Sequence, residues 1–443
     1  MSGPKVVRIV TREEIMEICR GLIARVDAAL EDWIRIGTRN GLLDAAEIAA
    51  ARGHRDALAE ALARGRFEDL QKQAPAEEAF LREDIQRRLA QAAAEEAAAR
   101  SKARREREAA ATLLKALRKA GAPLAADLEA GLERGDPAAV GRGLLLLGGA
   151  APSPKTDAGL AARLREGETP PAAFTDRAAD GTRAQPVEPG DPEIERIAAR
   201  IAQIRRIGQP ETPTPWSARL DEAEAAPPER RRLILDALEV ETGRALAAAR
   251  RRAAALSELR AARAEAEALG LATEVRTENP EALEIEAMEA RRAETIAAVQ
   301  ALRASRAAEA RRAAVLAGLG ALGYEVSENM STSWASEGRL VLRSALRPDY
   351  GVEVSGGDRL QMRPVAFDRN GRGPDPSRDQ DAETLWCGDV EGLEKRLSSF
   401  GDALRIERGL PVGAVPLKRI EIGDPGRADE AEAPAPSRTK SRP

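Results

Sequence analysis

Aromatic side chains are scarce in this chain of 443 residues: Phe, Trp and Tyr make up only 2% of it, whereas Asp, Glu, Lys and Arg make up 32%. Large globular cores draw heavily on bulky apolar and aromatic residues, so this composition argues against a chain built mainly of large globules. Alanine and arginine are abundant instead. Alanine is the strongest helix former and fits a narrow seam between helices, so we expect an alanine-rich, mainly α protein with coiled-coil segments.

Cysteine and histidine are also rare. Cys19 and Cys387 are too few for a disulfide framework, which is typical of a reducing compartment. The longest apolar run, Leu144 to Leu147, is far shorter than the roughly 20 residues that span a membrane, and the first residues contain no apolar signal region. We therefore expect a cytoplasmic protein that does not enter a membrane.

The chain also lacks a large net charge, because 69 Lys and Arg residues nearly balance 73 Asp and Glu residues. Such a balance gives no strong overall field to attract nucleic acid or an anionic membrane. Any electrostatic recognition must therefore depend on a local cluster of charges.

The usual catalytic and cofactor motifs are missing. The sequence contains no GxxxxGK[ST], GxGxxG, HExxH or GxSxG pattern. His54 lies among charged residues without a partner for acid–base chemistry, and Cys19 lies on an apolar stripe where a small buried side chain is expected. Cys387 follows Trp386 in a region without histidine, so packing is also the preferred interpretation for this thiol.

The segment from Asp368 to Asp379 is similar to a calcium-binding loop in the spacing of its oxygen side chains. Arg372 occupies the fifth position, where a ligand is needed, and Pro374 occupies the seventh. We interpret this segment as a polar loop. The sequence thus predicts no catalytic residues, no metal, no cofactor and no enzymatic activity.

The first predicted domain, residues 1–74, is an N-terminal helical hairpin. It begins with a short strand at 5–10, and Thr11 and Glu14 then form a capping box that starts a helix ending near Gly37. A second helix from Asp44 to Gly65 is expected to pack against it as an antiparallel partner. One face of the first helix carries an apolar stripe of Ile15, Cys19, Leu22, Val26, Ala29, Trp33 and Ile36.

Three further segments precede the C-terminal quarter. Residues 75–150 are expected to form a long alanine-rich helix, starting after Pro75, followed by short helices. Residues 151–228 are rich in proline, which predicts a flexible linker with one short helix near Ile194. Residues 229–319 predict a coiled-coil hairpin with two antiparallel arms.

Residues 320–423 predict a small two-layer α+β domain, and residues 424–443 a disordered tail. This domain contains over half of the aromatic residues: Tyr324, Trp334, Tyr350, Phe367, Trp386 and Phe400. The expected antiparallel sheet has strands at 324–327, 339–345, 350–355 and 359–367, and a helix at 381–400 covers one face. Alternation of side chains places Val354 opposite Leu360, with Gly356-Gly357-Asp358 as the hairpin loop.

Two basic clusters are candidate binding surfaces. The four arginines of the expected sheet, Arg339, Arg343, Arg359 and Arg363, alternate with Leu340, Leu342, Leu360 and Met362. They are expected to share the outer face, where they either bind an acidic partner or phosphate, or simply keep the sheet soluble. The second cluster, at 100–119 on the long helix, is interleaved with glutamates and favours a salt-bridged, solvated face over a phosphate-binding one.

These observations favour a non-enzymatic structural or adaptor protein. In this hypothesis a coiled-coil scaffold spans distance, and the C-terminal α+β domain binds a protein partner. Self-association through the helices is a further option. The alternative is a nucleic-acid-associated accessory factor that uses the basic helix at 100–119 or the arginine face of the sheet.

Overall fold

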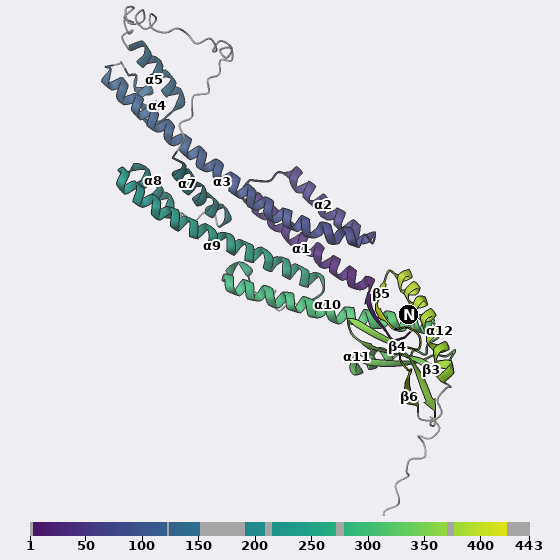
Figure 1. Cartoon of the computed structure of the whole chain (residues 1–443). Helices are drawn as coiled ribbons and strands as arrows, with labels where there is room; N and C mark the ends of the chain where they lie inside the picture. The colour runs from purple at the N-terminus through teal and green to yellow at the C-terminus, as the bar shows by residue number, and fades with distance from the viewer. Residues whose placement is uncertain are drawn as a thin grey trace, which may run out of the picture. The chain divides into compact units, whose positions relative to one another are not determined.

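The computed structural model describes residues 3–121, 124–150, 191–208, 215–271, 279–369 and 376–422. The protein is mainly α-helical with one small, largely antiparallel sheet, which confirms the prediction of a mainly α protein with a small C-terminal α+β domain (Figure 1). It divides into two compact units: one of Met1–Leu30, Ala50–Glu78 and Glu258–Pro443, the other of Glu31–Ala49 and Ala79–Ser257. Of the linker predicted over 151–228, residues 151–190 lie outside the described residues, as does the predicted tail at 424–443. The rest of that range contains the expected short helix, Pro192–Ile207, and a second helix, Pro215–Ala225, and both contribute to a buried core instead of a flexible linker.

Helices dominate both units. Their bounds are α1 (Arg12–Arg39), α2 (Ala45–Ala63), α3 (Phe67–Lys119), α4 (Ala126–Arg134), α5 (Pro137–Ala150), α7 (Pro192–Ile207), α8 (Pro215–Ala225), α9 (Pro228–Ala268), α10 (Ile285–Ala321), α11 (Met330–Glu337) and α12 (Asp379–Phe400). None of the described helices is long and apolar enough to cross a lipid bilayer.

The predicted antiparallel pairing of α1 and α2 is confirmed. The Arg55 guanidinium of α2 donates to Asp27 of α1 at 2.9 Å, and nearer the turn Leu43 packs against Gly37. The predicted capping pair at the start of α2 is also present, because the Glu47 amide donates to Asp44 at 2.8 Å and the Asp44 amide donates to Glu47 at 3.0 Å. Side-chain acceptors of this kind satisfy the free amides of a first helical turn.

Helix α3 begins earlier than predicted, at Phe67, and contains Pro75 within its third turn. Proline cannot donate an amide hydrogen bond, which is why the sequence favours a start after Pro75. Leu70 and Ala74 are buried in the two turns before the proline. Their burial stabilises the early turns despite the missing hydrogen bond.

The prediction of an antiparallel hairpin over 229–319 is wrong in the relative direction of its two helices, as the residues from Glu258 onward, which belong to the first unit, show. Here Glu258 and Glu265 of α9 pair with Arg292 and Arg303 of α10 at 2.5 and 2.7 Å, in the same order along both helices. The two helices therefore run parallel where they overlap. An alanine seam accepts either direction, and Glu281, just before α10, pairs with Arg260 of α9 at 2.6 Å, so α10 starts beside α9 rather than at its end.

Two small helical cores can be described in the second unit. Ile194, Ile197 and Ile201 of α7 pack with Leu220 of α8 and Leu238 of α9. The second core joins the end of α3 to α4 and α5; its buried members are Ala110, Leu113, Leu114, Leu117, Leu128, Leu132 and Ala139.

The sheet has six strands in the order β2-β3-β4-β1-β5, with β6 parallel to β4 and the other pairs antiparallel. Their bounds are β1 (Lys5–Val10), β2 (Arg339–Arg343), β3 (Tyr350–Gly356), β4 (Arg359–Arg369), β5 (Ala403–Gly409) and β6 (Lys418–Ile422). The predicted N-terminal strand is thus present, but it pairs inside the C-terminal sheet. The predicted strand at 324–327 is reduced to a single bridge between Tyr324 and Ser344.

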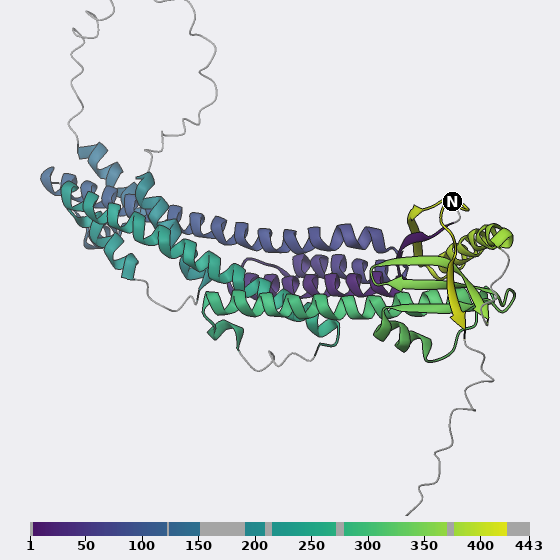
Figure 2. The ribbon, with the colours of Figure 1, turned by 60° about the horizontal axis from the view of Figure 1, so that its bottom comes forward.

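One face of this sheet forms the core of the first unit. Figures 1 and 2 show α12 and the sheet side by side. The buried strand residues of this face are Val7, Ile9, Leu342, Val352, Val354, Leu360, Met362 and Leu404, and they pack with residues of α10, α11 and α12. Trp334 of α11 and Trp386 of α12 are each 1% exposed and are the largest side chains of this core.

The predicted β3–β4 register is wrong by two residues. Val354 lies opposite Met362 rather than Leu360, and Gly356 lies opposite Leu360. Gly356 extends β3 by one residue with φ 99°, a conformation that glycine adopts freely and other residues rarely adopt. A shift of two preserves which face each side chain occupies, so the predicted inner and outer faces are correct.

Candidate functional site

The four arginines singled out by the sequence all lie on the outer face of the sheet. Their neighbours in the strands, such as Leu342 and Leu360, are buried in the core, and strand side chains alternate between faces. The side chains of Arg339 and Arg359 are 64% and 73% exposed. The structure therefore gathers the four residues on one accessible surface, as predicted.

Four further basic residues, missed by sequence reasoning, extend this surface. Arg8 lies on β1 between the buried Val7 and Ile9, and Arg405 and Arg408 on β5 lie opposite Arg8 and Val6. Lys418 enters from β6. We name the resulting surface the basic face; it consists of Arg8, Arg339, Arg343, Arg359, Arg363, Arg405, Arg408 and Lys418.

Glu353 is the carboxylate at the centre of one half of the basic face. It is 3% exposed, accepts a hydrogen bond from Lys418 Nζ at 2.8 Å and another from Arg363 Nε, and lies 4.0 Å from Arg339. Burial alone would raise the pKa of Glu353, but the hydrogen bonds and charges of Arg363 and Lys418 outweigh it and lower the pKa below its ordinary value. Glu353 therefore stays ionised and holds these three cations together.

Glu407 is the second carboxylate that the described strands place beside this surface, and it pairs with Arg359 at 3.1 Å. Eight basic side chains thus face two carboxylates. Seven of the eight are arginines, whose planar guanidinium binds carboxylate and phosphate groups through two parallel hydrogen bonds.

The only aromatic ring that the described strands place on the basic face is covered. Phe367 of β4 is 4% exposed, and the Arg343 guanidinium lies 5.4 Å from its ring centre. Gly351 makes room for this ring, since a Cβ atom at that position would come within 2.8 Å of it. The basic face consequently offers guanidinium groups rather than an aromatic stacking platform.

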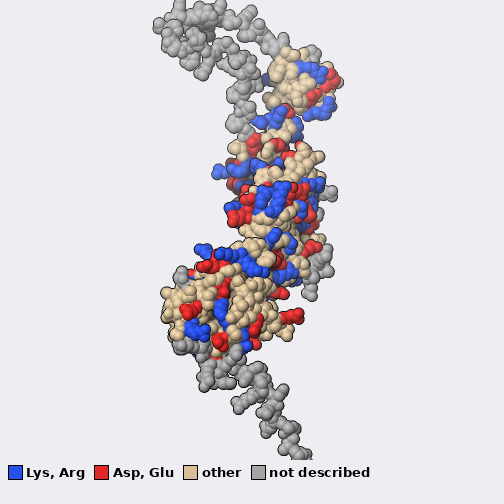
Figure 3. Space-filling model, turned by 90° about the vertical axis from the view of Figure 1, so that its right-hand side faces the viewer, with Lys and Arg blue, Asp and Glu red and all other residues tan. Residues whose placement is uncertain are grey.

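The basic segment at 100–119 has a different character. Arg100 of α3 pairs with Asp221 at 2.6 Å, Arg118 pairs with Glu129, and Arg104 lies 3.8 Å from Glu108. These contacts fit the salt-bridged interpretation of the segment. In the view of Figure 3, acidic and basic side chains are interspersed and neither sign covers the visible surface.

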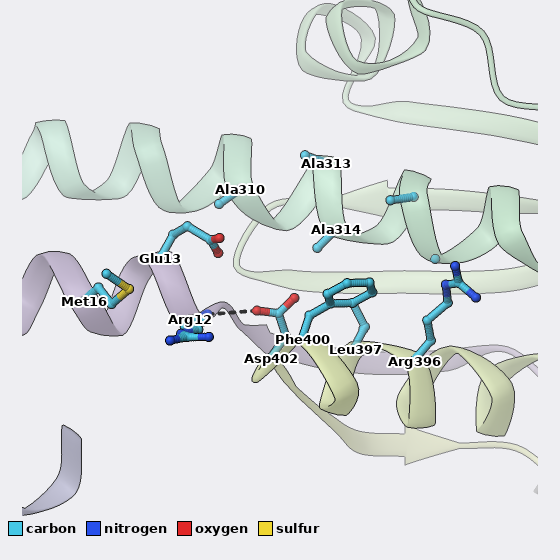
Figure 4. A pocket seen from close by; sticks show the side chains of 12 residues that line it. Arg12, Glu13, Met16, Ala310, Ala313, Ala314, Arg396, Leu397, Phe400 and Asp402 are labelled. Atoms are coloured by element: carbon cyan, nitrogen blue, oxygen red, sulfur yellow. Dashed lines mark hydrogen bonds between the residues drawn. The ribbon is translucent and has the colours of Figure 1, made fainter. Parts of the chain in front are cut away.

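A pocket of about 710 Å³ lies where the start of α1, α10 and the end of α12 meet (Figure 4). Its α10 wall consists of Ala310, Ala313, Ala314, Ala317 and Gly318. Phe400 of α12 lines it and remains 62% exposed. The Asp402 carboxylate accepts a hydrogen bond from the Arg12 amide at 2.8 Å, so it serves as a cap for α1. The lining contains neither histidine nor cysteine.

The other candidates from the sequence are dispersed. His54 is 67% exposed and lies 3.6 Å from Glu77. Cys19 is fully buried, and burial raises the pKa of its thiol. Cys387 is half-buried and accepts a hydrogen bond from Lys5 Nζ at 3.4 Å.

The predicted polar loop after Asp368 is only partly visible, because residues 370–375 lie outside the described ranges. At its far end Asp379 accepts hydrogen bonds from Arg419 at 2.7 Å and from the Tyr350 hydroxyl at 3.0 Å. Burial and the bond to Asp379 raise the pKa of Tyr350 to about 12. In the described part of the chain, no three His, Cys, Asp or Glu side chains come together as a possible metal site.

No protein-family model, no curated protein and no solved structure matches this chain.

Proposed function

We propose that this chain is a non-enzymatic, cytoplasmic structural or adaptor protein whose α+β domain binds an acidic protein partner through the basic face. The observation that carries the proposal is that the described strands place eight basic side chains but two carboxylates on one accessible sheet face. Like charges gathered on one surface repel one another and lower stability. Solubility alone needs only a mixture of signs, so this excess favours recognition of an anion.

A protein partner accounts for the basic face better than a nucleic acid does. Proteins that bind single strands usually stack bases on exposed aromatic rings, whereas Phe367 is buried beneath Arg343. The other candidate for phosphate binding, the segment at 100–119, has Arg100 and Arg118 engaged with carboxylates. Acidic side chains of a partner are the simplest complement to guanidinium groups.

The helices of the first unit support a scaffolding role. Arg25 of α1 pairs with Glu78 of α3 at 2.9 Å and lies 3.5 Å from Glu265 of α9, which in turn pairs with Arg303 of α10. The two carboxylates are nearly buried. Linked charges of this kind fix the register of packed helices, because a shift along the axis would leave a buried charge without its partner.

A titration with poly-L-glutamate tests this proposal on the full-length chain. The test variant replaces Arg339, Arg343, Arg359 and Arg363 by Gln. The control variant replaces four exposed arginines outside the sheet by Gln, and so changes the net charge by the same amount as the test variant. These arginines are Arg52, Arg66, Arg134 and Arg244. We expect wild type and control to bind alike and the test variant to bind at least about tenfold more weakly.

The affinity of the wild-type protein for poly-L-glutamate must also fall as the salt concentration rises. Exposed charge pairs are screened beyond about 8 Å at physiological ionic strength. Duplex DNA and single-stranded RNA serve as parallel probes. Equal loss of binding in both variants would contradict the proposal, and tighter binding of a nucleic acid than of polyglutamate would favour the nucleic-acid alternative.

A further inference from the structure

Three arginines form a lateral row across neighbouring strands of the sheet. In the register of β1 with β5, Arg8 lies directly opposite Arg405. In the register of β1 with β4, Arg8 lies directly opposite Arg359. We name Arg405, Arg8 and Arg359 the arginine row; β1 carries its middle member and is flanked by the other two.

This arrangement is unfavourable for the sheet by itself. Residues directly opposite on antiparallel strands have Cβ atoms only about 4.5–5.5 Å apart, and like charges at such positions are destabilising. All three side chains are exposed. Glu407 neutralises one of them through its contact with Arg359, and neither Arg8 nor Arg405 takes part in an ion pair among the described residues. The row therefore carries a net positive charge that does not stabilise the fold of the sheet.

The spacing of the row selects a particular kind of acidic partner. Neighbouring strands lie about 4.8 Å apart, so the row extends over about 10 Å perpendicular to the strands. Acidic side chains at i, i+4 and i+7 of an α-helix lie on one face and extend over about 10.5 Å at 1.5 Å per residue. Alternate side chains of an extended strand would extend over about 13 Å. The helix matches the row more closely.

We propose that the arginine row binds an α-helix of a partner protein that carries a carboxylate on each of three successive turns and lies across β5, β1 and β4. This inference rests on the proposed function, because it specifies the partner of the same basic face. Each guanidinium then meets one carboxylate. Arg359 already engages a carboxylate, that of Glu407, and exchanges it for the partner's side chain.

Two synthetic alanine-based helical peptides of identical composition test the inference. The same-face peptide has three Glu residues on one face, one per turn, and the split-face peptide has the same three Glu residues distributed around the helix. Both are titrated into the full-length protein at low salt by fluorescence anisotropy. We expect the same-face peptide to bind about tenfold more tightly, because only it forms three charge pairs at once.

Two matched variants of the protein localise the effect. The row variant combines Arg8→Gln, Arg359→Gln and Arg405→Gln. The control variant combines Arg52→Gln, Arg66→Gln and Arg134→Gln, which are exposed arginines outside the sheet, and it changes the net charge by the same amount. We expect the row variant to bind both peptides equally weakly and the control variant to keep the tenfold preference. Since the row variant removes repulsion, it is expected to melt no earlier than wild type; the single variant Arg405→Gln provides a milder version of the same test.

The outcomes separate this inference from the proposed function. If the two peptides bind equally and substitutions anywhere on the basic face abolish this binding, the assignment of a helical partner is overturned. The proposal of an acidic partner would still hold. Loss of the preference in the control variant instead of the row variant would also overturn it. Absence of binding by either peptide and by polyglutamate would contradict both.

Discussion

Replacing Glu353 by Gln separates the stability of the sheet from the binding property of the basic face. Glu353 is nearly buried on β3 and holds Arg363 and Lys418 by hydrogen bonds, with Arg339 at 4.0 Å. The Glu353→Gln substitution keeps the size of the side chain and removes its charge. The three cations would then face one another without a carboxylate between them.

The expected cost at neutral pH is about 1–2 kcal/mol of unfolding free energy. Charged hydrogen bonds contribute about 1.5–3 kcal/mol each when buried, but Arg363 and Lys418 are more than a third exposed, so solvent screening reduces this value. The pKa of Glu353 is lowered from 4.5 in the folded protein. A lowered folded-state pKa gives stability that is present above the unfolded value and is lost as pH falls through the folded one.

Hydrogen exchange followed by mass spectrometry measures this effect locally, on peptides covering β3 and β4. Glu353→Gln should speed exchange there at pH 7, and the difference from wild type should vanish at a pH well below 4.5, where protonated Glu resembles Gln. Released cations should also raise affinity for polyglutamate by about threefold. Unchanged exchange at pH 7, or weaker binding of polyglutamate, would show that Glu353 does not hold these cations.

Three further substitutions test individual packing claims. Gly351→Ala should destabilise the sheet by about 2 kcal/mol or more, since the new Cβ would lie 2.2 Å from the Leu342 carbonyl oxygen; thermal unfolding with no loss would contradict this. Asp402→Ala should cost about 1 kcal/mol through loss of the α1 cap, whereas Asp402→Asn should keep most of the stability; urea unfolding of Asp402→Ala with no loss would show that the cap is unimportant. Lys5→Met should raise stability by about 1 kcal/mol. Lys5 is buried, and among the described residues its ammonium group donates to the Cys387 sulfur, which is a weak acceptor. A lower melting temperature of the variant would contradict this.

Local signals in the sequence were enough to predict most helices and to predict which strand residues lie on the outer face of the sheet. The caps at Thr11 and Asp44 marked two helix starts, and alternation placed Arg339 and Arg363 on the outer face regardless of register. A two-residue error in pairing does not move a side chain from one face to the other. For this reason the outer face was predictable even though the β3–β4 register was not.

Long-range pairing was beyond local signals. The strand at 5–10 was recognisable by itself, but nothing near it reveals that β4 and β5, some 350 to 400 residues away, are its neighbours. The arginine row was therefore invisible, because it depends on Arg8 lying between two strands from the other end of the chain. The direction of α10 relative to α9 depends in the same way on pairs such as Glu265 with Arg303, which an alanine seam does not specify.

The central claim is that the basic face, and within it the arginine row, receives a partner's carboxylates. The most direct measurement is NMR of the arginine Nε–Hε groups in the full-length protein, titrated with the same-face peptide and assigned by single Arg→Lys variants. We expect saturable chemical-shift changes at Arg8, Arg359 and Arg405, with smaller ones at Arg339. Shifts confined to Arg12 and Arg396, which line the pocket beside Phe400, or no shifts at any arginine of the sheet, would contradict it.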